Sequence, residues 1–255
     1  MGDDFSRVGD GVLSHRLCPL CLGWPGRHAW LGVWFVSEEW LFLVNIASLQ
    51  EMKIFGIGMN YQEHNKELQD TLLYKDPVVF TKADSSLLMG GKPFFIPHYT
   101  QQCEYETELV VRINHLGRSI PERFAHRYYD EVTVGIDFTA RDLQCKLRKA
   151  GLPWELSKGF DGSAVIGTWT ALAGVGEVQD LHFHLDINGH TVQRGYTGDM
   201  LHGVDKIISY LSQFFMLKTG DIIFTGTPAG VGAVHVDDHL QGYLEDKLLL
   251  DFHVR

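Results

Sequence analysis

The chain carries, at residues 105–113, the stretch YETELVVRI, in which two glutamates lead into a β-branched and apolar run. Such a run favours an extended strand over a helix. Side chains alternate between the two faces of a strand, so Glu106 and Glu108 point the same way, with Cα atoms about 6.6 Å apart. Two carboxylates held side by side repel each other unless a cation lies between them. The stretch therefore predicts a strand whose first residues suit a cation.

A third carboxylate, Asp137, lies in the segment GIDFTARD at residues 135–142. Oxygen ligands suit a hard divalent cation, and Mg²⁺ typically keeps several waters or substrate oxygens among its ligands. Together Glu106, Glu108 and Asp137 indicate a magnesium site. The alternative is a solvated strand edge with two surface glutamates, which spacing alone does not exclude.

Composition narrows the class of function. The 255 residues, 45% of them hydrophobic, can bury one sizeable core. A net charge of -10 argues against binding to nucleic acid or to anionic membranes, because phosphate-rich partners attract positive charge. The four cysteines lack the spacing of a disulfide framework, which fits a reducing, cytoplasmic location, and no apolar run is long enough to span a bilayer. We therefore expect a small-molecule partner.

Residues 1–51 differ from the rest of the chain. They hold four of the six tryptophans and two of the four cysteines, without clear periodicity, whereas MKIFGIG at residues 52–58 is typical of the opening strand of a domain. We predict an atypical N-terminal extension at 1–51, not native if Met52 is the natural start, and a catalytic domain at 52–255. Deleting residues 1–51 is then expected to leave a folded, active protein, and loss of either property would contradict this hypothesis.

The remaining pattern mixes strands with helices. Periodicity and turn residues favour helices at 60–68, 122–129, 143–149 and 201–216, and strands at 77–82, 94–97, 132–138, 181–187 and 221–224. The alternating segment at 181–187 meets Asn188-Gly189, a strong signal for a two-residue hairpin. A mixed fold with one core is expected.

Five segments occur in a fixed order along residues 52–255: NYQEH at 60–64, YETEL at 105–109, DFTARDLQ at 137–144, PWELSK at 153–158 and TGTPAGVG at 225–232. In this order they resemble the fumarylacetoacetate hydrolase family, most closely its short members of the acylpyruvate hydrolase and oxaloacetate decarboxylase type. The resemblance implies an α+β fold: a β-rich mixed-sheet roll with peripheral helices, like the C-terminal domain of that family. It also implies a homodimer.

The resemblance assigns metal ligands and one catalytic cation. Glu106, Glu108 and Asp137 become the ligands of Mg²⁺ or Mn²⁺, and Lys158 lies in the active site, where its ammonium stabilises negative charge on a substrate oxygen. The alternative for Lys158 is an ordinary solvated lysine.

The resemblance also places His64 and Glu67 on a segment that closes over bound substrate. Residues three apart share one face of a helical turn, so the imidazole and the carboxylate can interact as an acid/base pair. Arg141, Gln144 and Thr227 are assigned to substrate binding. Arg141 and Gln144 could equally be structural hydrogen-bonding residues, and the alternative for the segment of Thr227 is a tight turn that needs glycine. Family members often carry arginine where this chain has Met59, which bears on how a substrate carboxylate is held.

The activity that the resemblance implies is divalent-metal-dependent cleavage of a carbon-carbon bond in a small 2-oxo acid. Acylpyruvate hydrolysis and oxaloacetate decarboxylation both pass through a metal-stabilised enolate, so one site can support both reactions. An isomerase or decarboxylase of a 2-hydroxy-dienoic dicarboxylate in aromatic catabolism is the alternative enzyme. A noncatalytic metal- or ligand-binding module is the alternative outside enzymes.

Overall fold

The computed structural model describes residues 52–68 and 75–255, which belong to one compact unit. The extension predicted at residues 1–51 lies outside the described residues. None of the helices in the described part of the chain is both long enough and apolar enough to cross a membrane.

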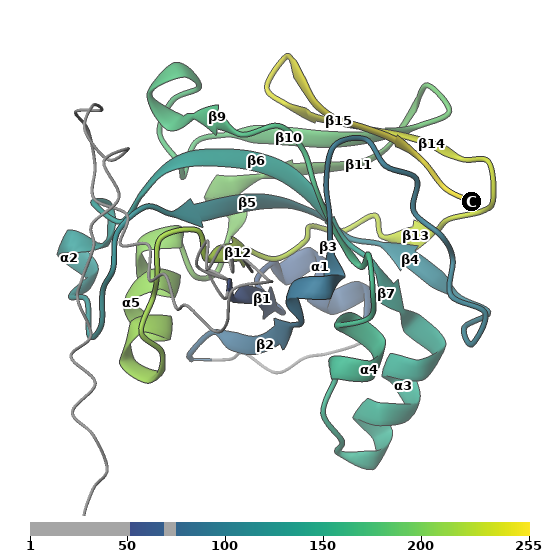
Figure 1. Cartoon of the computed structure of the whole chain (residues 1–255), viewed down its shortest axis with the longest axis horizontal. Coiled ribbons are helices and arrows are strands. Elements are labelled where there is room, and N and C mark those ends of the chain that lie inside the picture. Colours follow the sequence, from purple (N-terminus) through teal and green to yellow (C-terminus); the bar gives the residue numbers. More distant parts are fainter. Residues whose placement is uncertain (1–51, 69–74) are drawn as a thin grey trace, which may run out of the picture. The chain divides into compact units, whose positions relative to one another are not determined.

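The core is a mixed eight-stranded sheet in the order β2-β1-β12-β5-β6-β8-β3, with β9 paired to β6. Its strands are β1 (Ile54–Gly58), β2 (Val78–Lys82), β3 (Leu87–Leu88), β5 (Thr107–Ile113), β6 (Tyr129–Asp137), β8 (Ala164–Ile166), β9 (Thr170–Ala171) and β12 (Ile222–Phe224). Strand β1 runs parallel to β12, and β3 runs parallel to β8. The pairs β12–β5, β5–β6 and β6–β8 are antiparallel. In Figure 1 the long strands β5 and β6 arch across the molecule.

A second sheet, in the order β11-β10-β14-β15, lies along the arch of β5 and β6 (Figure 1). Its strands are β10 (His182–Ile187), β11 (His190–Tyr196), β14 (His239–Leu244) and β15 (Lys247–His253). Leu109 and Val134 of the large sheet share one apolar cluster with Phe183 and Leu244 of the second sheet. Each such side chain contributes about 1.5–3 kcal/mol when fully buried, so this contact holds the two layers together.

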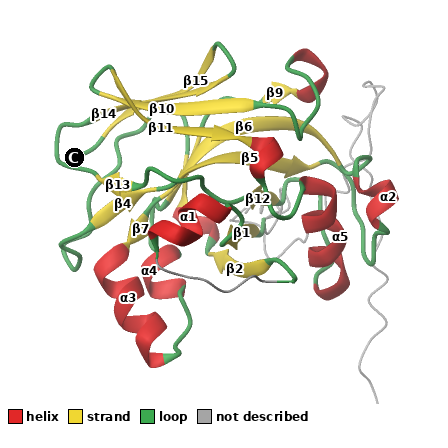
Figure 2. Cartoon of the chain, turned by 180° about the vertical axis from the view of Figure 1, so that it is seen from behind, coloured by secondary structure: helices red, strands yellow, loops and turns green. Residues whose placement is uncertain are grey.

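Helices lie at the periphery of the sheets, as Figure 2 shows in red. The α-helices are α1 (Gln62–Glu67), α2 (Glu122–Ala125), α3 (Arg141–Ala150), α4 (Glu155–Lys158) and α5 (Val204–Phe214), and short 3-10 helices span Asp84–Ser86, Leu172–Gly174 and Thr197–Asp199. Helix α5 buries Val204, Ile207, Ile208 and Leu211, which recur at the spacing of one helical face. The observed architecture confirms the predicted α+β roll of mixed sheets with peripheral helices.

Two predicted elements differ from the structure. The helix expected at 122–129 ends at Ala125, because Tyr129 pairs with Ile113 and begins β6, so sheet pairing overrides local helix preference. In the strand expected at 94–97, Phe94 alone forms a β-bridge, to Val254. The hairpin at Asn188-Gly189 is confirmed by the antiparallel pair β10 and β11.

A third, small sheet positions the site. It consists of β4 (Cys103–Tyr105), β7 (Thr139–Ala140) and β13 (Gly232–Ala233), in the order β13-β4-β7. Strand β4 leads through Glu106 into β5, and β6 leads through Phe138 into β7. The chain therefore crosses between the small sheet and the large one twice, from β4 into β5 and from β6 into β7, at the predicted carboxylates.

Candidate metal centre and active site

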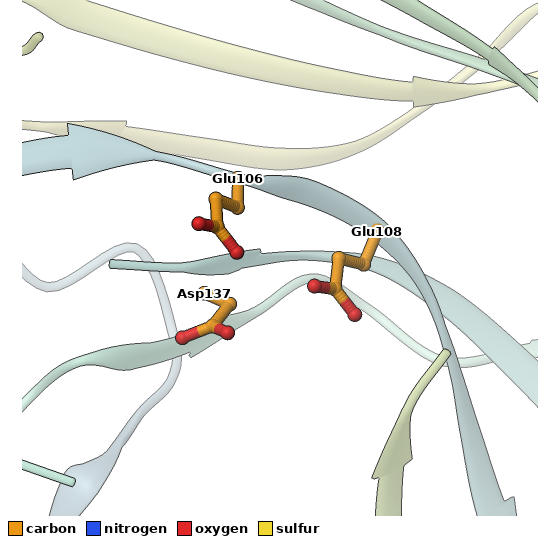
Figure 3. A group of neighbouring side chains, drawn as sticks. All are labelled: Glu106, Glu108 and Asp137. Atoms are coloured by element: carbon orange, nitrogen blue, oxygen red, sulfur yellow. The ribbon is translucent and has the colours of Figure 1, made fainter. Parts of the chain in front are cut away.

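The structure brings the three predicted carboxylates together. Glu106 joins β4 to β5, Glu108 lies in β5, and Asp137 ends the antiparallel partner β6. One carboxylate oxygen from each lies within 4.8 Å of the other two, and all three residues are buried. Figure 3 shows the three side chains directed toward a common space. Strand alternation accounts for the two glutamates, and the β5–β6 pairing adds Asp137.

Three cations lie against this cluster. Lys158, at the end of α4, donates hydrogen bonds to Glu106 Oε2 at 2.6 Å, Asp137 Oδ2 at 2.7 Å and Thr139 Oγ1 at 2.6 Å. Lys82 Nζ lies 2.6 Å from Asp137 Oδ1. Arg141, the first residue of α3, donates to Glu106 and, at 2.6 Å, to Glu104 Oε2. Glu106 and Asp137 are therefore neutralised by the protein itself.

These ion pairs fix the charge states of the cluster. Burial opposes ionisation of Glu106, but Lys158 and Arg141 outweigh it and hold the pKa of Glu106 far below its usual range. Burial likewise acts to lower the pKa of Lys158, yet Asp137 and Glu106 raise it above its usual value. Lys158 is consequently an ammonium at neutral pH, with all three of its protons engaged.

Glu108 is the carboxylate that lacks a counter-charge. Within the described part of the chain it has no Lys or Arg partner at ion-pair distance, and it accepts one hydrogen bond, from Gly226 N–H at 2.6 Å. Burial, together with the charges of Asp137 and Glu106, raises the pKa of Glu108 well above its usual value. A divalent cation shared with the other two carboxylates removes this penalty, and each oxygen keeps a second lone pair for it. The donor set therefore fits Mg²⁺ or Mn²⁺.

His64 and Glu67 form the predicted pair. In α1, His64 Nδ1 lies 3.2 Å from Glu67 Oε2, and Glu67 Oε1 accepts a hydrogen bond from Gly230 N–H at 2.9 Å. His64 is 4% exposed, and its burial lowers the pKa of the imidazole below the usual 6.5, against the opposing effects of Glu106 and Glu67. The imidazole is therefore neutral at pH 7, the state that a general base requires.

A narrow pocket of about 20 Å³, about the space of one water molecule, borders these groups, although Glu67, Glu108 and Asp137 do not line it. Six of the predicted site residues line it: His64, Glu106, Arg141, Gln144, Lys158 and Thr227. Met59, Leu68, Phe80 and Trp154 supply an apolar wall. Gln144 accepts a hydrogen bond from Arg141 at 2.5 Å, and Thr227 donates one to Thr107 C=O at 2.9 Å. The pocket is thus lined by charged and apolar side chains together.

Three further residues belong to this site without having been predicted. Lys82 is 5% exposed, and the apolar strand that it ends is the sequence feature that could have indicated its burial. Glu104 stands two residues before Glu106, so the alternation that singled out Glu106 and Glu108 could also have found it. Gln193 comes from β11, and no local motif marks it.

A family model and several known proteins match most of this chain. Residues 53–253 match the family model described as fumarylacetoacetate (FAA) hydrolase, C-terminal. The mitochondrial oxaloacetate tautomerase of Rattus norvegicus is 35% identical over 201 residues, which are 79% of this chain and 90% of that protein. A mitochondrial oxaloacetate tautomerase of Arabidopsis thaliana is 41% identical over 187 residues, 73% of this chain and 83% of the relative.

A solved structure supports the same grouping. The fumarylpyruvate hydrolase of Pseudomonas aeruginosa, in complex with Mn²⁺ and pyruvate, is 33% identical, with a TM-score of 0.74 over 79% of this chain and 88% of that one. The fold, the family model and these relatives agree across nearly the whole of residues 52–255. The chain is thus an enzyme of the fumarylacetoacetate hydrolase family.

Proposed function

We propose that this enzyme acts on a small 2-oxo acid and cleaves the carbon-carbon bond next to a carbonyl with the help of Mg²⁺ or Mn²⁺. The observation that carries the proposal is the buried convergence of Glu106, Glu108 and Asp137 beside Lys158 and His64. The complex of the Pseudomonas relative with Mn²⁺ and pyruvate supports both the ion and the substrate class. We also propose a homodimer, as the resemblance implies. The cytoplasmic location stays a prediction, and the two oxaloacetate tautomerases named above are mitochondrial.

The three carboxylates would hold the ion, which supplies Lewis-acid polarisation of the substrate's 2-oxo group and carboxylate. In hydrolysis of an acylpyruvate, His64 Nε2 accepts a proton from a water molecule, which attacks the distal carbonyl, while Glu67 orients the imidazole through Nδ1. The tetrahedral adduct then collapses: the acyl fragment leaves as a carboxylic acid as the carbon-carbon bond breaks, and the electron pair of that bond becomes an enolate on the 2-oxo oxygen. Lys158 stabilises this negative charge until protonation gives pyruvate. Decarboxylation of oxaloacetate forms the same enolate without an attacking water.

Keto-enol tautomerisation of oxaloacetate is a second candidate function. Two relatives with 35% and 41% identity are named oxaloacetate tautomerases. Tautomerisation needs a base that removes a proton from C3 and a cation that stabilises the enolate, and His64 and Lys158 are the matching groups of this site. The two candidates thus share an enolate intermediate and the groups that stabilise it, and they differ in the bond whose cleavage forms it: carbon-carbon in hydrolysis and decarboxylation, C3–H in tautomerisation.

A substrate panel tests the proposal. Acylpyruvates, oxaloacetate and 2-hydroxy-dienoic diacids are assayed with metal-stripped protein and again after adding Mg²⁺ or Mn²⁺. We expect metal-dependent release of pyruvate from an acylpyruvate or from oxaloacetate. Metal-dependent loss of enol absorbance without pyruvate identifies the tautomerase, conversion of the dienoic diacid identifies the isomerase, and no turnover with any substrate contradicts enzymatic 2-oxo acid chemistry.

Replacing His64 is expected to separate hydrolysis from decarboxylation. His64→Ala removes the base that activates water, so kcat for acylpyruvate hydrolysis falls by about 100- to 10,000-fold, whereas oxaloacetate decarboxylation falls less. His190→Ala, which removes an exposed histidine of β11, serves as the control and leaves both rates unchanged. Equal losses in the two reactions after His64→Ala remove the water-activation role.

The pH dependence of hydrolysis follows from the burial of His64. Because burial lowers the pKa of the imidazole below its usual value, the decline of kcat/KM toward acid pH, where the base becomes protonated, is expected at lower pH than for an exposed histidine. Glu67 raises the pKa of His64, so Glu67→Gln moves this decline to still lower pH. Profiles of kcat/KM from pH 4.5 to 8.5 measure both effects, and a shift toward higher pH in Glu67→Gln contradicts the assignment.

A further inference from the structure

Gln193 of β11, in the second sheet, contacts both strand β5 and the loop that follows β12. Its side chain is 2% exposed and uses both amide protons and the carbonyl oxygen. The oxygen accepts a hydrogen bond from Thr107 N–H at 3.0 Å, and the amide nitrogen donates to Thr227 Oγ1 and to Pro228 C=O, each at 2.8 Å. One buried amide thus joins β5 to the loop that follows β12.

Thr107 stands between the carboxylates Glu106 and Glu108, and side chains hold both of its backbone polar groups. Gln193 binds its N–H, and Thr227 Oγ1 donates to its C=O at 2.9 Å. Because the Thr227 hydroxyl is in turn an acceptor for Gln193, the three residues form a closed ring of hydrogen bonds. This ring fixes the loop at residues 226–230 against the carboxylate-bearing strand.

The two ends of the same loop contact different parts of the site. Gly226 N–H donates to Glu108 Oε2 at 2.6 Å, and Gly230 N–H donates to Glu67 Oε1 at 2.9 Å. Both glycines have positive φ, 102° and 101°, which other L-residues rarely adopt. A Cβ at residue 226 would also lie 2.7 Å from Cβ of Asn60. The amide directions at both ends therefore depend on the middle of the loop, which Gln193 holds.

We propose that Gln193 is a positioning residue that couples the carboxylate cluster to helix α1, because it fixes a loop that binds Glu108 at one end and Glu67 at the other. Glu67 in turn orients His64. An effect of Gln193 on catalysis rests on the proposed function. The positioning of the loop by Gln193 does not depend on any substrate. Gln193 itself does not line the pocket, so its effect passes through Thr227, Gly226 and Gly230.

The test replaces Gln193 by methionine, which keeps the length of the side chain and removes its hydrogen bonds. Two quantities are measured on metal-stripped, full-length protein: the Kd for Mn²⁺ by titration calorimetry, and amide hydrogen exchange of Gly230 and of α1. We expect the Kd to rise by about 10-fold, as for other residues that orient metal ligands. Exchange at Gly230 and in α1 is expected to become about 10-fold faster through loss of the supporting hydrogen bonds.

Ser212→Ala is the matched control. Ser212 is buried in α5, where its hydroxyl accepts from Ile120 N–H at 2.8 Å and donates to Ser209 C=O at 2.9 Å. The control loses comparable buried hydrogen bonds away from the carboxylates, so it reports the effect of reduced global stability alone. It should leave both quantities unchanged. If Gln193→Met does not fold, Gln193→Asn, which is too short to keep all three contacts, is judged by the same two measurements.

The outcomes are distinct. Changes in both quantities in the Gln193 variant, absent from Ser212→Ala, support the proposal. A change in only one quantity, in neither, or in both to the same extent in Ser212→Ala overturns the coupling. Failure of the wild-type protein to bind Mn²⁺ and to turn over any 2-oxo acid contradicts the proposed function, while the exchange measurement still decides whether Gln193 positions the loop.

Discussion

Glu108→Gln is expected to weaken Mn²⁺ binding by at least about 100-fold and to abolish metal-dependent turnover, because it removes one of three anionic ligands. The same change should stabilise the metal-free protein. Burial and the charges of Asp137 and Glu106 raise the pKa of Glu108, so its ionised form costs free energy of folding. This cost grows as the pH rises above the pKa of an exposed glutamate, and glutamine does not carry it. The amide oxygen can still accept the Gly226 hydrogen bond.

Titration calorimetry with Mn²⁺ and denaturant unfolding of metal-stripped protein at pH 6 and pH 8 measure these effects. We expect the variant to gain stability relative to wild type, and to gain more at pH 8. Glu104→Gln is the control, since Glu104 is a buried carboxylate next to the trio that binds Arg141 and Gln102 instead. It should keep Mn²⁺ affinity and lose stability. Unchanged Mn²⁺ binding and turnover in Glu108→Gln refute the ligand assignment.

Lys158→Met is expected to lower kcat by about 100- to 1,000-fold through loss of the cation that stabilises the enolate. It should not weaken Mn²⁺ binding, because removal of a positive charge beside Glu106 and Asp137 favours another cation there. The variant should also lose about 3–5 kcal/mol of stability, since two buried carboxylates lose a partner. This combination of intact metal binding and lost turnover is specific to a charge-stabilising role.

Lys82→Met is the matched control for this change. Lys82 is as buried as Lys158 and also pairs with Asp137, but its ammonium contacts Ser163 and Lys158 C=O and does not line the pocket. It should lose similar stability with a much smaller change in kcat. Lys158→Arg, which retains the charge, provides a folded variant if methionine is not tolerated. Equal kcat losses in the Lys82 and Lys158 variants would show that both act only through the stability of the cluster.

The strand that carries the two glutamates of the site and the hairpin at residues 188–189 could be predicted from the sequence. Glu106 and Glu108 share a face because a strand has a period of two, and the hairpin at Asn188-Gly189 follows from turn chemistry. The position of Asp137 next to them depends on the β5–β6 register, in which Thr107 lies opposite Ile136. Such a register is set by packing across the whole sheet, so only family resemblance could anticipate it.

The residues that local reasoning missed are those that act across long sequence separations. Lys82 meets Asp137 across 55 positions (137 minus 82), and Gln193 meets Thr107 across 86. A single lysine or glutamine is usually a surface residue; the apolar strand that ends at Lys82 is only a weak sign of its burial, and no local motif marks Gln193. The same applies to the end of α2, where the pairing of Tyr129 overrides a helical pattern.

Lys82, Lys158 and Arg141 form ion pairs with the carboxylates, so most of the negative charge at the site is balanced without a metal ion. The protein carries its own counter-ions for all but one unit of the negative charge of Glu104, Glu106, Glu108 and Asp137. Folding is therefore separable from the supply of divalent ions, unlike in small domains that fold only around a metal. Under the proposed metal dependence, scarcity of free Mg²⁺ or Mn²⁺ would stop turnover reversibly and leave a folded protein that regains activity when the ion returns.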